Sequence, residues 1–427
     1  MKSNSDFLVS KVWDVIVIGG GPSGMMAAGC SAKNGASVLL LEKNRQLGRK
    51  LLLTGGGRCN IFKAEEDEKK LLSKYKSSEK FLYSPFSQHG MQDSWDFFES
   101  LGLPIVVEAR KRAFPKSQKA TDVLRVLKKF MLDSGVKIRT AVTVNGFKTE
   151  NEKITGVETT VGLLKAKNYV LSTGGKSYPE TGSTGEGFVW LKNLGHTVYN
   201  PKPDLVPLTV KEDWVKKLSG TSLSFMKITF ATDRDKVKEK FSRTGKILFT
   251  HFGISGPLVL DSSRKVKQLL QKGPVLTEID LYPDTDLGTV RKRVINIFEK
   301  NKNKDLKNVL PLIVPEGLSE AILSLIPKKV ALKKVHSIVK EEREELADLL
   351  KAVPLTVTGS MGFDWAIISD GGVDLKEVDT KTMSSKIHSN LYLTGDVLNI
   401  VRPSGGYSLQ LCWTTGYVAG NHAFKNK

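Results

Sequence analysis

Residues 14–24 read DVIVIGGGPSG, an apolar run that passes directly into the pattern Gly19-x-Gly21-x-x-Gly24. A short continuous apolar run of this kind is typical of a buried parallel strand. Glycines at this spacing permit a tight turn, a close approach of the backbone to a pyrophosphate and close packing of the next helix, whose N-terminus favours negative charge. The stretch therefore predicts a dinucleotide-binding strand, turn and helix.

The residues that follow strengthen this prediction. Residues 36–41 read ASVLLL, a second apolar strand, and Glu42 stands at its end. A carboxylate about 20 residues after the glycines can accept hydrogen bonds from the ribose hydroxyls of an adenosine. A lone glycine pattern is weak evidence, because glycine turns between strands and helices are common. Here strand, glycines, helix, second strand and Glu42 occur in order, so we predict a dinucleotide site and not a merely structural turn.

The far end of the chain indicates which dinucleotide is bound. Residues 390–396 read NLYLTGD, a strand that ends at Thr394-Gly395-Asp396, and Ser404-Gly405-Gly406-Tyr407 opens the final helix. The Asp396 side chain can accept a hydrogen bond from a ribityl hydroxyl, which favours FAD over NAD. The alternative is that Asp396 is an ordinary helix cap or turn aspartate.

Composition is that of a large enzyme. The chain has 427 residues with 40% hydrophobic content, enough to bury a sizeable core in two or three domains. Cys30, Cys59 and Cys412 are too few and too scattered for a disulfide framework or a Cys-rich zinc site. The histidines show no ligand spacing, so we predict no metal. The sequence shows no apolar signal segment and no run of about 20 apolar residues, so we predict a cytoplasmic protein with no membrane partner. Oligomeric state is not predicted.

Charge is the second unusual feature. The formal net charge is +20, from 65 Lys and Arg against 45 Asp and Glu, with a pI near 9.6. An excess of this size attracts polyanions such as RNA. The charge also clusters, because residues 291–340 hold twelve Lys and Arg against four Asp and Glu, and a smaller basic cluster surrounds Phe114-Pro115. The alternative is that these runs are simply solvated helix faces.

Changes of pattern divide the chain. From His196 onward, short alternating segments predict a small β-barrel or sandwich. Residues 285–348 are rich in lysine, helical in period and interrupted by prolines, which predicts a helical region. Strand-like segments return at 355–373, after which the last strand and helix rejoin the nucleotide domain.

Six motifs resemble the BaiN/RdsA flavoprotein family, also called YhiN-like, and the resemblance runs over nearly the full length. They are GGGRCN at 55–60, GGKSYP at 174–179, TGSTG at 181–185, THFGISGP at 250–257, GGV at 371–373 and TMSSK at 382–386. The resemblance implies a discontinuous Rossmann-like FAD domain with an inserted β-barrel domain and a small helical domain. We therefore predict an α/β fold in five segments, which are the FAD domain (1–195), the barrel (196–284), the basic helical domain (285–348), the return strands of the barrel (349–372) and the rest of the FAD domain (373–427).

The resemblance also bears on the site. The candidate cofactor residues are Gly19, Gly21, Pro22, Ser23, Gly24, Glu42, Lys43, Arg49, Gly56, Gly57, Arg58, Asn60, Val142, Thr173, Gly174, Gly175, Gly182, Thr184, Gly395, Asp396, Gly405, Gly406 and Tyr407. One departure from the family pattern is Asp396 at a position where glutamate is expected, which keeps a carboxylate. Another is Arg402, in a neighbourhood that is usually acidic or neutral, where it could alter the flavin potential or substrate choice.

Two residues are candidates for catalysis. Cys59 and His251 belong to turns that are expected to approach the isoalloxazine ring, and the guanidinium of Arg58 next to Cys59 can lower the pKa of a thiol. Either residue could supply a proton to a carbon that is reduced by hydride. The alternatives are that Cys59 is a small residue packed in a glycine turn and that His251 is a structural histidine.

The electron donor is only partly predictable. Residues 182–187 lack the spacing and the acidic partner of a second nucleotide-binding unit. We therefore expect NAD(P)H to dock transiently at the flavin, with a reduced carrier protein as the alternative donor.

Three functions remain open. Activities linked to the family are dihydrouridine formation in large-subunit ribosomal RNA, aminoacetone oxidation and steps of bile-acid dehydroxylation. The first hypothesis is an FAD-dependent reductase of uridine in large-subunit ribosomal RNA. The second is an oxidoreductase or oxidase of a small amine or a steroid-like molecule. The third is a non-catalytic RNA-binding protein that is stabilised by flavin.

Overall fold

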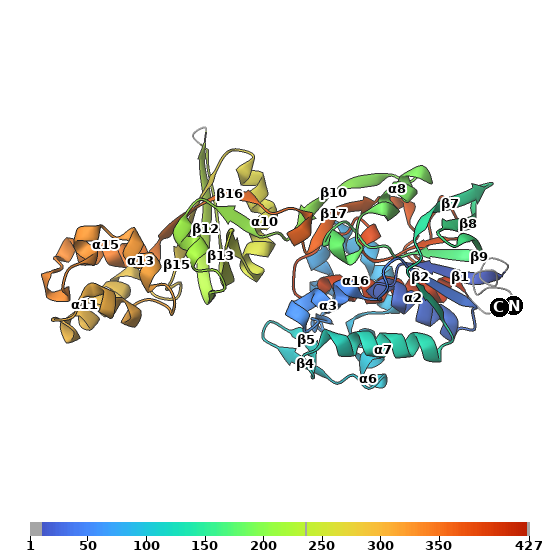
Figure 1. Ribbon diagram of the computed structural model, residues 1–427, viewed down its shortest axis with the longest axis horizontal. Coiled ribbons are helices and arrows are strands. Elements are labelled where there is room, and N and C mark those ends of the chain that lie inside the picture. The colour runs from blue at the N-terminus through green and yellow to red at the C-terminus, as the bar shows by residue number, and fades with distance from the viewer. Residues whose placement is uncertain (1–10, 235–236, 425–427) are drawn as a thin grey trace. The chain divides into compact units, whose positions relative to one another are not determined.

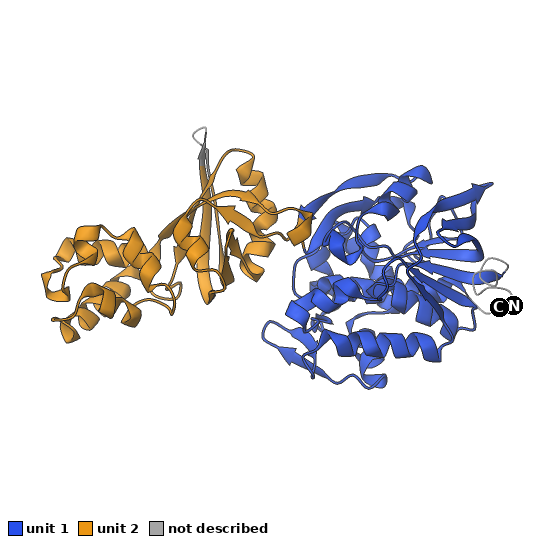
Figure 2. Ribbon diagram, in the orientation of Figure 1, with its two compact units in different colours: residues 1–203, 367–427 blue, residues 204–366 orange. Residues whose placement is uncertain are grey.

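The structure, a computed structural model, describes residues 11–234 and 237–424. It divides into two compact units, which are coloured separately in Figure 2. Unit 1 combines residues 1–203 with 367–427, and unit 2 is the segment 204–366 between them. Each unit has its own hydrophobic core.

Unit 1 is built on a seven-stranded sheet, of which β1, β2, β7, β8 and β9 are labelled in Figure 1. The first strand, β1 (Val12–Ile18), pairs in parallel with β2 (Val38–Glu42) on one side and with β9 (Gly162–Leu171) on the other. The sheet continues to β6 (Lys137–Thr140) beyond β2 and to β8 (Lys153–Thr159) and β7 (Val144–Glu150) beyond β9, while β18 (Leu391–Leu393) also pairs with β9. Every residue of β2 is buried, as expected for a parallel strand that is covered on both faces.

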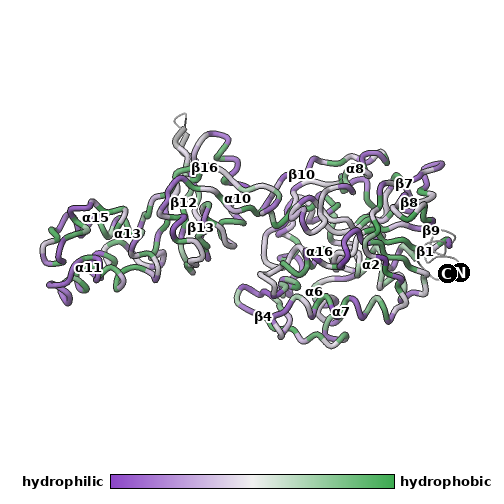
Figure 3. Tube along the Cα trace, viewed as in Figure 1, coloured by the Kyte–Doolittle hydropathy of each residue, from purple (hydrophilic) through white to green (hydrophobic). Residues whose placement is uncertain are grey.

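The two ends of unit 1 meet in one helical layer. Helix α2 (Pro22–Lys33) packs against α16 (Tyr407–Ala423), and Figure 3 shows hydrophobic residues concentrated around β1, α2 and α16. A Cβ atom on Gly416 would lie 2.5 Å from the Ser23 carbonyl oxygen, and one on Gly420 would lie 2.5 Å from that of Ala27. Glycine is therefore required at both positions, because the helices touch through their backbones.

Unit 2 contains a closed antiparallel barrel. Its six strands are β11 (Leu208–Val210), β14 (Gly253–Ser255), β13 (Val237–Thr250), β12 (Ser222–Arg234), β15 (Val275–Asp280) and β16 (Val353–Ser360), and β16 pairs back with β11. Helix α10 (Pro257–Leu270) packs on the barrel. The chain between β15 and β16 forms α11 (Leu287–Lys300), α12 (Leu306–Val309), α13 (Ser319–Leu325), α14 (Lys328–Ala331) and α15 (Lys340–Lys351). Barrel and helices share one core.

The predicted fold class, an α/β Rossmann-like domain with an inserted barrel and helices, is confirmed. Two strands have partners that the sequence pattern does not reveal. The segments β10 (Val198–Asp204) and β17 (Ile368–Val373), which lie in the ranges predicted for the barrel and its return strands, pair with each other in a separate two-stranded sheet. The five-segment division of the chain stays a prediction.

None of the helices in the described part of the chain is both long enough and apolar enough to cross a membrane.

Candidate functional site

The glycine turn between β1 and α2 brings backbone segments into close contact. Gly19 has φ +108°, its N–H donates to the Leu41 carbonyl at 2.8 Å, and a Cβ there would lie 2.4 Å from the Ser172 carbonyl oxygen. A Cβ on Gly24 would lie 2.0 Å from the Gly19 carbonyl oxygen. Gly21 differs, because a Cβ there would meet nothing within 4 Å. Open space therefore lies directly at the N-terminus of α2, where a pyrophosphate is stabilised.

Glu42 is held in place by the same turn. This buried carboxylate accepts hydrogen bonds from the Gly20 N–H at 2.8 Å and from the backbone and side-chain nitrogens of Asn44 at 2.8 and 2.7 Å. Beside it lies a hollow of about 390 Å³ whose lining includes Glu42, Val142 and Trp190. A carboxylate next to an apolar wall suits the ribose and adenine of an adenosine.

A second hollow, with about 900 Å³ of open space, continues from the first. Both are lined by Gly19, Glu42, Thr173 and Gly182, so together they form one elongated cleft within unit 1. The second hollow also brings the two ends of the chain together, since residues 19–23 face the C-terminal residues Asp396, Ser408, Leu409 and Cys412.

An unpaired polar atom supports the presence of a ligand in this cleft. Thr173 lines both hollows, and its buried hydroxyl has no hydrogen-bond partner among the residues that the structure describes. Buried hydroxyls rarely remain unpaired in native proteins. Together with the open helix N-terminus and the oriented Glu42, this atom shows that the residues present fit FAD.

Twelve of the predicted cofactor residues line the cleft and the others do not. The lining residues are Gly19, Gly21, Pro22, Ser23, Glu42, Lys43, Arg49, Val142, Thr173, Gly174, Gly182 and Asp396. The lining does not include Gly24, Gly56, Gly57, Arg58, Asn60, Gly175, Thr184, Gly395, Gly405, Gly406 or Tyr407. As a whole, the predicted set of cofactor residues stays a prediction.

Lys50, Ser408 and Cys412 also line the cleft, although they were not predicted as cofactor residues. Lys50 lies on α3 (Arg49–Leu53), between the predicted Arg49 and three leucines. Its position next to Arg49 was the available signal for it. No comparable local signal marks Ser408 or Cys412, since the fold alone brings α16 to the glycine turn.

Asp396 lies at the C-terminal end of the cleft and is paired with two cations. Its carboxylate bonds to the guanidinium of Arg402 and lies 3.7 Å from Lys50 Nζ. Burial by itself raises the pKa of Asp396, but the charges of Arg402 and Lys50 outweigh this effect, so the pKa is lowered. Thr394, and not Asp396, is the N-cap of the short helix at Gly395–Val397.

Arg402 does not face the cleft. It is 2% exposed, and it also donates to Ser408 Oγ at 2.9 Å and to the Ile400 carbonyl at 2.8 Å. Its position is therefore behind Asp396.

The predicted activation of Cys59 by Arg58 is wrong. Arg58 turns to Glu108 and Gln118, at 2.8 and 2.9 Å, while the Cys59 side chain is fully buried. Burial raises the pKa of the Cys59 thiol to about 12. Side chains of consecutive residues can point to different surroundings, which the sequence pattern does not show. Cys59 does not line the cleft, and its catalytic role stays a prediction.

His251 belongs to unit 2 and is exposed. It forms an aromatic cluster with Phe252 and Trp365, at ring-centroid distances of 4.9 and 6.4 Å, and those two rings lie 5.0 Å apart. The role of His251 as a proton donor stays a prediction.

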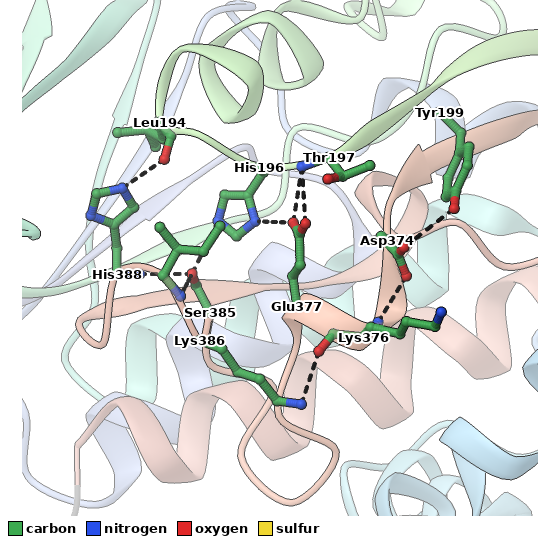
Figure 4. A network of polar contacts seen from close by, with 11 residues as sticks. Leu194, His196, Thr197, Tyr199, Asp374, Lys376, Glu377, Ser385, Lys386 and His388 are labelled. Atoms are coloured by element: carbon green, nitrogen blue, oxygen red, sulfur yellow. Dashed lines mark hydrogen bonds and ion pairs between the residues drawn. The ribbon is translucent and has the colours of Figure 1, made fainter.

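Two other histidines join a buried polar network in unit 1, shown in Figure 4. His196 contacts Glu377 at 2.9 Å through Nδ1 and Ser385 at 3.0 Å through Nε2. His388 contacts the Glu152 and Leu194 carbonyls at 2.8 and 2.9 Å. These contacts link segments that are far apart in sequence. Over the described ranges, no group of three or more His, Cys, Asp and Glu is arranged to hold a metal ion.

The fold and the cleft define the class, a Rossmann-fold flavoprotein whose site is assembled from both ends of the chain. Residues 13–422 match the model of the HI0933-like protein Rossmann domain, and the chain belongs to this family. As a member of this family, the protein is an FAD-dependent oxidoreductase.

Two relatives align over nearly the whole chain. The 3-dehydro-bile acid delta(4,6)-reductase of Clostridium scindens is 31% identical over 95% of this chain and 98% of its own length. The ribosomal RNA dihydrouridine synthase of Haemophilus influenzae is 29% identical over 96% of this chain and 98% of its own length.

Solved structures show the same fold. A flavocytochrome c3 fumarate reductase has a TM-score of 0.54 at 15% identity, with 97% of this chain and 78% of that chain covered. A 3-ketosteroid-delta4-(5alpha)-dehydrogenase from Rhodococcus jostii has a TM-score of 0.54 at 13% identity, with 97% of both chains covered.

Proposed function

We propose that this protein reduces a uridine of large-subunit ribosomal RNA to dihydrouridine. The observation that carries the proposal is a basic ladder in unit 2, formed by two antiparallel segments, 302–306 and 333–336. The His336 N–H donates to the Lys302 carbonyl at 3.1 Å, and the Val335 N–H donates to the Lys304 carbonyl at 3.0 Å. This main-chain pairing sets exposed lysines side by side.

The ladder and its surroundings carry unpaired positive charge. Lys302, Lys304 and Lys334 are exposed, and none of them forms an ion pair within the described part of the chain. Further exposed lysines of the helical region are Lys300, Lys307, Lys328, Lys329 and Lys340. A dense array of solvated ammonium groups suits the phosphates of RNA, whereas a small neutral substrate has no need of it.

The two relatives suggest one kind of chemistry. One is named a delta(4,6)-reductase of a 3-dehydro-bile acid and the other a dihydrouridine synthase, and both names describe the saturation of a carbon–carbon double bond conjugated to a carbonyl. In uridine, a hydride is added to C6 and a proton to C5. FAD supplies the hydride when it is bound.

The residues of this chain serve this reaction by holding and orienting the cofactor and by supplying a proton. In our proposal, Glu42 binds the adenosine ribose, the N-terminus of α2 faces the pyrophosphate, and the Thr173 hydroxyl gains its missing partner. The proton for C5 comes from Cys59 or His251, and NAD(P)H supplies the electrons in a transient complex, with a reduced carrier protein as the alternative.

A small-molecule reductase is the second candidate. It is favoured by the bile-acid reductase, which at 31% identity is as similar to this chain as the RNA enzyme. The exposed aromatic cluster of His251, Phe252 and Trp365 offers a surface for a flat apolar ring. A non-catalytic RNA-binding protein is the third candidate.

Nucleoside mass spectrometry of ribosomal RNA tests the proposal. Large-subunit RNA from a strain without this protein is expected to lose one dihydrouridine, which returns on complementation with the intact gene. Unchanged dihydrouridine, together with turnover of a conjugated steroid ketone, would instead establish the small-molecule reductase. Anaerobic mixing with NADPH or NADH tests the donor, and bleaching of the flavin by neither would exclude direct reduction by nicotinamide.

A further inference from the structure

The C-terminal end of the cleft holds an unbalanced group of charges. Lys50 and Arg402 are two cations, and Asp396 is the carboxylate that contacts both. We call these three residues the cation cluster. Lys50 Nζ also donates to Ser177 Oγ, which positions the ammonium group at the cleft lining. Burial lowers the pKa of Lys50, and the carboxylate of Asp396 acts against this effect. With Lys50 protonated, two positive charges against one negative charge leave a net charge of +1.

The neighbouring titratable groups do not cancel this charge. Burial raises the pKa of Cys412 to about 12, so this thiol is neutral where it lines the cleft. Burial also raises the pKa of Tyr75, whose hydroxyl donates to the Tyr407 carbonyl at 2.9 Å. Helix α16, 17 residues long, begins at the same end, and the positive end of its dipole adds to the field.

The order of groups along the cleft indicates what faces the cation cluster. Glu42 and Trp190 lie at one end, where the adenosine fits, and Gly21 opens the space for the pyrophosphate next to it. The remaining part of FAD, the ribityl chain and the isoalloxazine ring, must then extend toward Asp396, Lys50 and Ser408. The cation cluster therefore lies at the redox-active end.

We infer that the cation cluster is a redox-tuning site, in which the excess positive charge of Lys50 and Arg402 over Asp396 raises the reduction potential of the bound flavin. Hydride transfer adds two electrons and one proton to the isoalloxazine ring, which leaves one extra negative charge on the ring. A buried positive charge stabilises this product more than the oxidised ring. The inference depends on FAD alone, and it holds whether the substrate is RNA or a small molecule.

The test is the midpoint potential of the FAD-loaded protein, measured by spectral titration against a reference dye. Lys50→Gln removes one positive charge and is expected to shift the reduction equilibrium at least about tenfold toward the oxidised form, which is about 30 mV for two electrons. Lys50→Arg keeps the charge and is expected to keep the potential. Arg402→Gln removes the second cation and is also expected to shift the potential downward.

Lys43→Gln is the matched control. Lys43 also lines the cleft, but at the adenosine end, where it pairs with Glu186 at 2.6 Å. Its loss removes the same charge and is expected to leave the potential unchanged. Equal shifts in Lys50→Gln and Lys43→Gln, or no shift in Lys50→Gln, would overturn the inference. If Lys50→Gln does not retain FAD, Arg402→Gln carries the test alone, and an upward or absent shift there overturns the inference.

Discussion

The cofactor cleft of unit 1 and the basic ladder of unit 2 differ in what they are made of. In unit 1 the cleft is made of backbone, glycines and a few buried side chains with assigned partners, such as Glu42 with Gly20 and Asn44. In unit 2 the basic ladder presents Lys302, Lys304 and Lys334, which are exposed and have no ion-pair partner within the described residues. Ligand binding in the cleft should depend on the positions of a few atoms, whereas ligand binding at the ladder should depend on the density of positive charge.

This difference predicts different tolerance to change. A cofactor that is to react must be held within fractions of an ångström, so errors in the cleft are costly. A phosphate backbone is attracted by the sum of many solvated charges, each of which contributes modestly. Substitutions in the two units should therefore have effects of different size and should affect different properties of the protein.

The largest effect is expected from Gly24→Ala in the cleft of unit 1. The new Cβ would lie 2.0 Å from the Gly19 carbonyl oxygen, so the turn must shift. We expect several kcal/mol of lost stability together with loss of bound FAD. Thermal unfolding of the apoprotein and the visible absorbance of the purified protein measure these two losses.

Gly21→Ala is the control for that variant. A Cβ at Gly21 meets no protein atom within 4 Å, so the stability of the apoprotein should stay within about 0.5 kcal/mol. FAD affinity should fall nevertheless, because the methyl group occupies the space proposed for the pyrophosphate. Equal apoprotein stabilities for the two variants would contradict our account of the turn.

Acid sensitivity is the next largest effect, and it should arise from unit 1. Burial of His89 lowers its pKa from 6.5 to about 4. The unfolded chain therefore binds a proton that the folded chain does not, and the free energy of unfolding should fall as the pH drops from about 6.5 to about 4. The loss from this group is about 3 kcal/mol at most.

Urea unfolding across this pH range measures the effect. His89→Phe keeps an aromatic ring to stack on Tyr417, whose ring lies 4.3 Å from that of His89, and should flatten the dependence. The exposed His336 of unit 2 is the comparison, and His336→Gln should leave the slope unchanged. A slope that is equally steep in the His89 variant would assign the acid sensitivity to another group.

The basic ladder should respond through salt. Replacing Lys302, Lys304 and Lys334 together with glutamine should weaken RNA binding at least about tenfold at low salt. The slope of log affinity against log salt should fall by about 0.7 to 0.9 for each lost phosphate contact. FAD content and unfolding temperature should not change.

A second triple variant is the matched control for the first. Lys69, Lys74 and Lys80 are exposed on unit 1, and their replacement by glutamine removes the same charge. Fluorescence anisotropy with a ribosomal RNA fragment at several salt concentrations compares the two variants. An equal loss of affinity in both would mean that net charge, and not the ladder, binds RNA.

The smallest effect is expected when a glutamate is replaced by glutamine in each unit. Glu377→Gln weakens the bonds that Glu377 accepts from His196 and from the Thr197 N–H, both at 2.9 Å, and should cost about 1 to 2 kcal/mol. Glu239→Gln in unit 2 breaks only a half-exposed pair with Lys272 and should cost less than about 0.5 kcal/mol. Urea unfolding ranks the two, and the reverse order would contradict the comparison.

Local patterns predicted the elements of unit 1 that depend on neighbours in sequence. The glycine turn is one example, because the apolar strand, Gly19, Gly21 and Gly24 act within one short stretch, and the β1–α2 unit begins there. Glu42 could be located for the same reason, since it ends the next strand. The far-end motif placed Asp396 at the cleft, although its pairing with Arg402 was not foreseen.

The remaining features depend on contacts between distant segments. Lys50 and Cys412 meet at the cleft only because α3 and α16 pack around the same turn. The adjacency of Arg58 and Cys59 was misleading, since one side chain reaches Glu108 and the other is buried. The change of pattern after His196 and the strand-like segments at 355–373 indicated strands but could not identify the pairing of β10 with β17.

The packing of α16 against α2 through Gly416 and Gly420 has a consequence for biosynthesis. The ribosome makes α2 early, then the whole of unit 2, and α16 only afterwards. A nascent chain therefore lacks Asp396, Ser408, Leu409 and Cys412 of the cleft lining for most of its synthesis. The cleft is complete only when residues 407–423 have left the exit tunnel, so we expect stable flavin loading to be a late event in the life of each polypeptide.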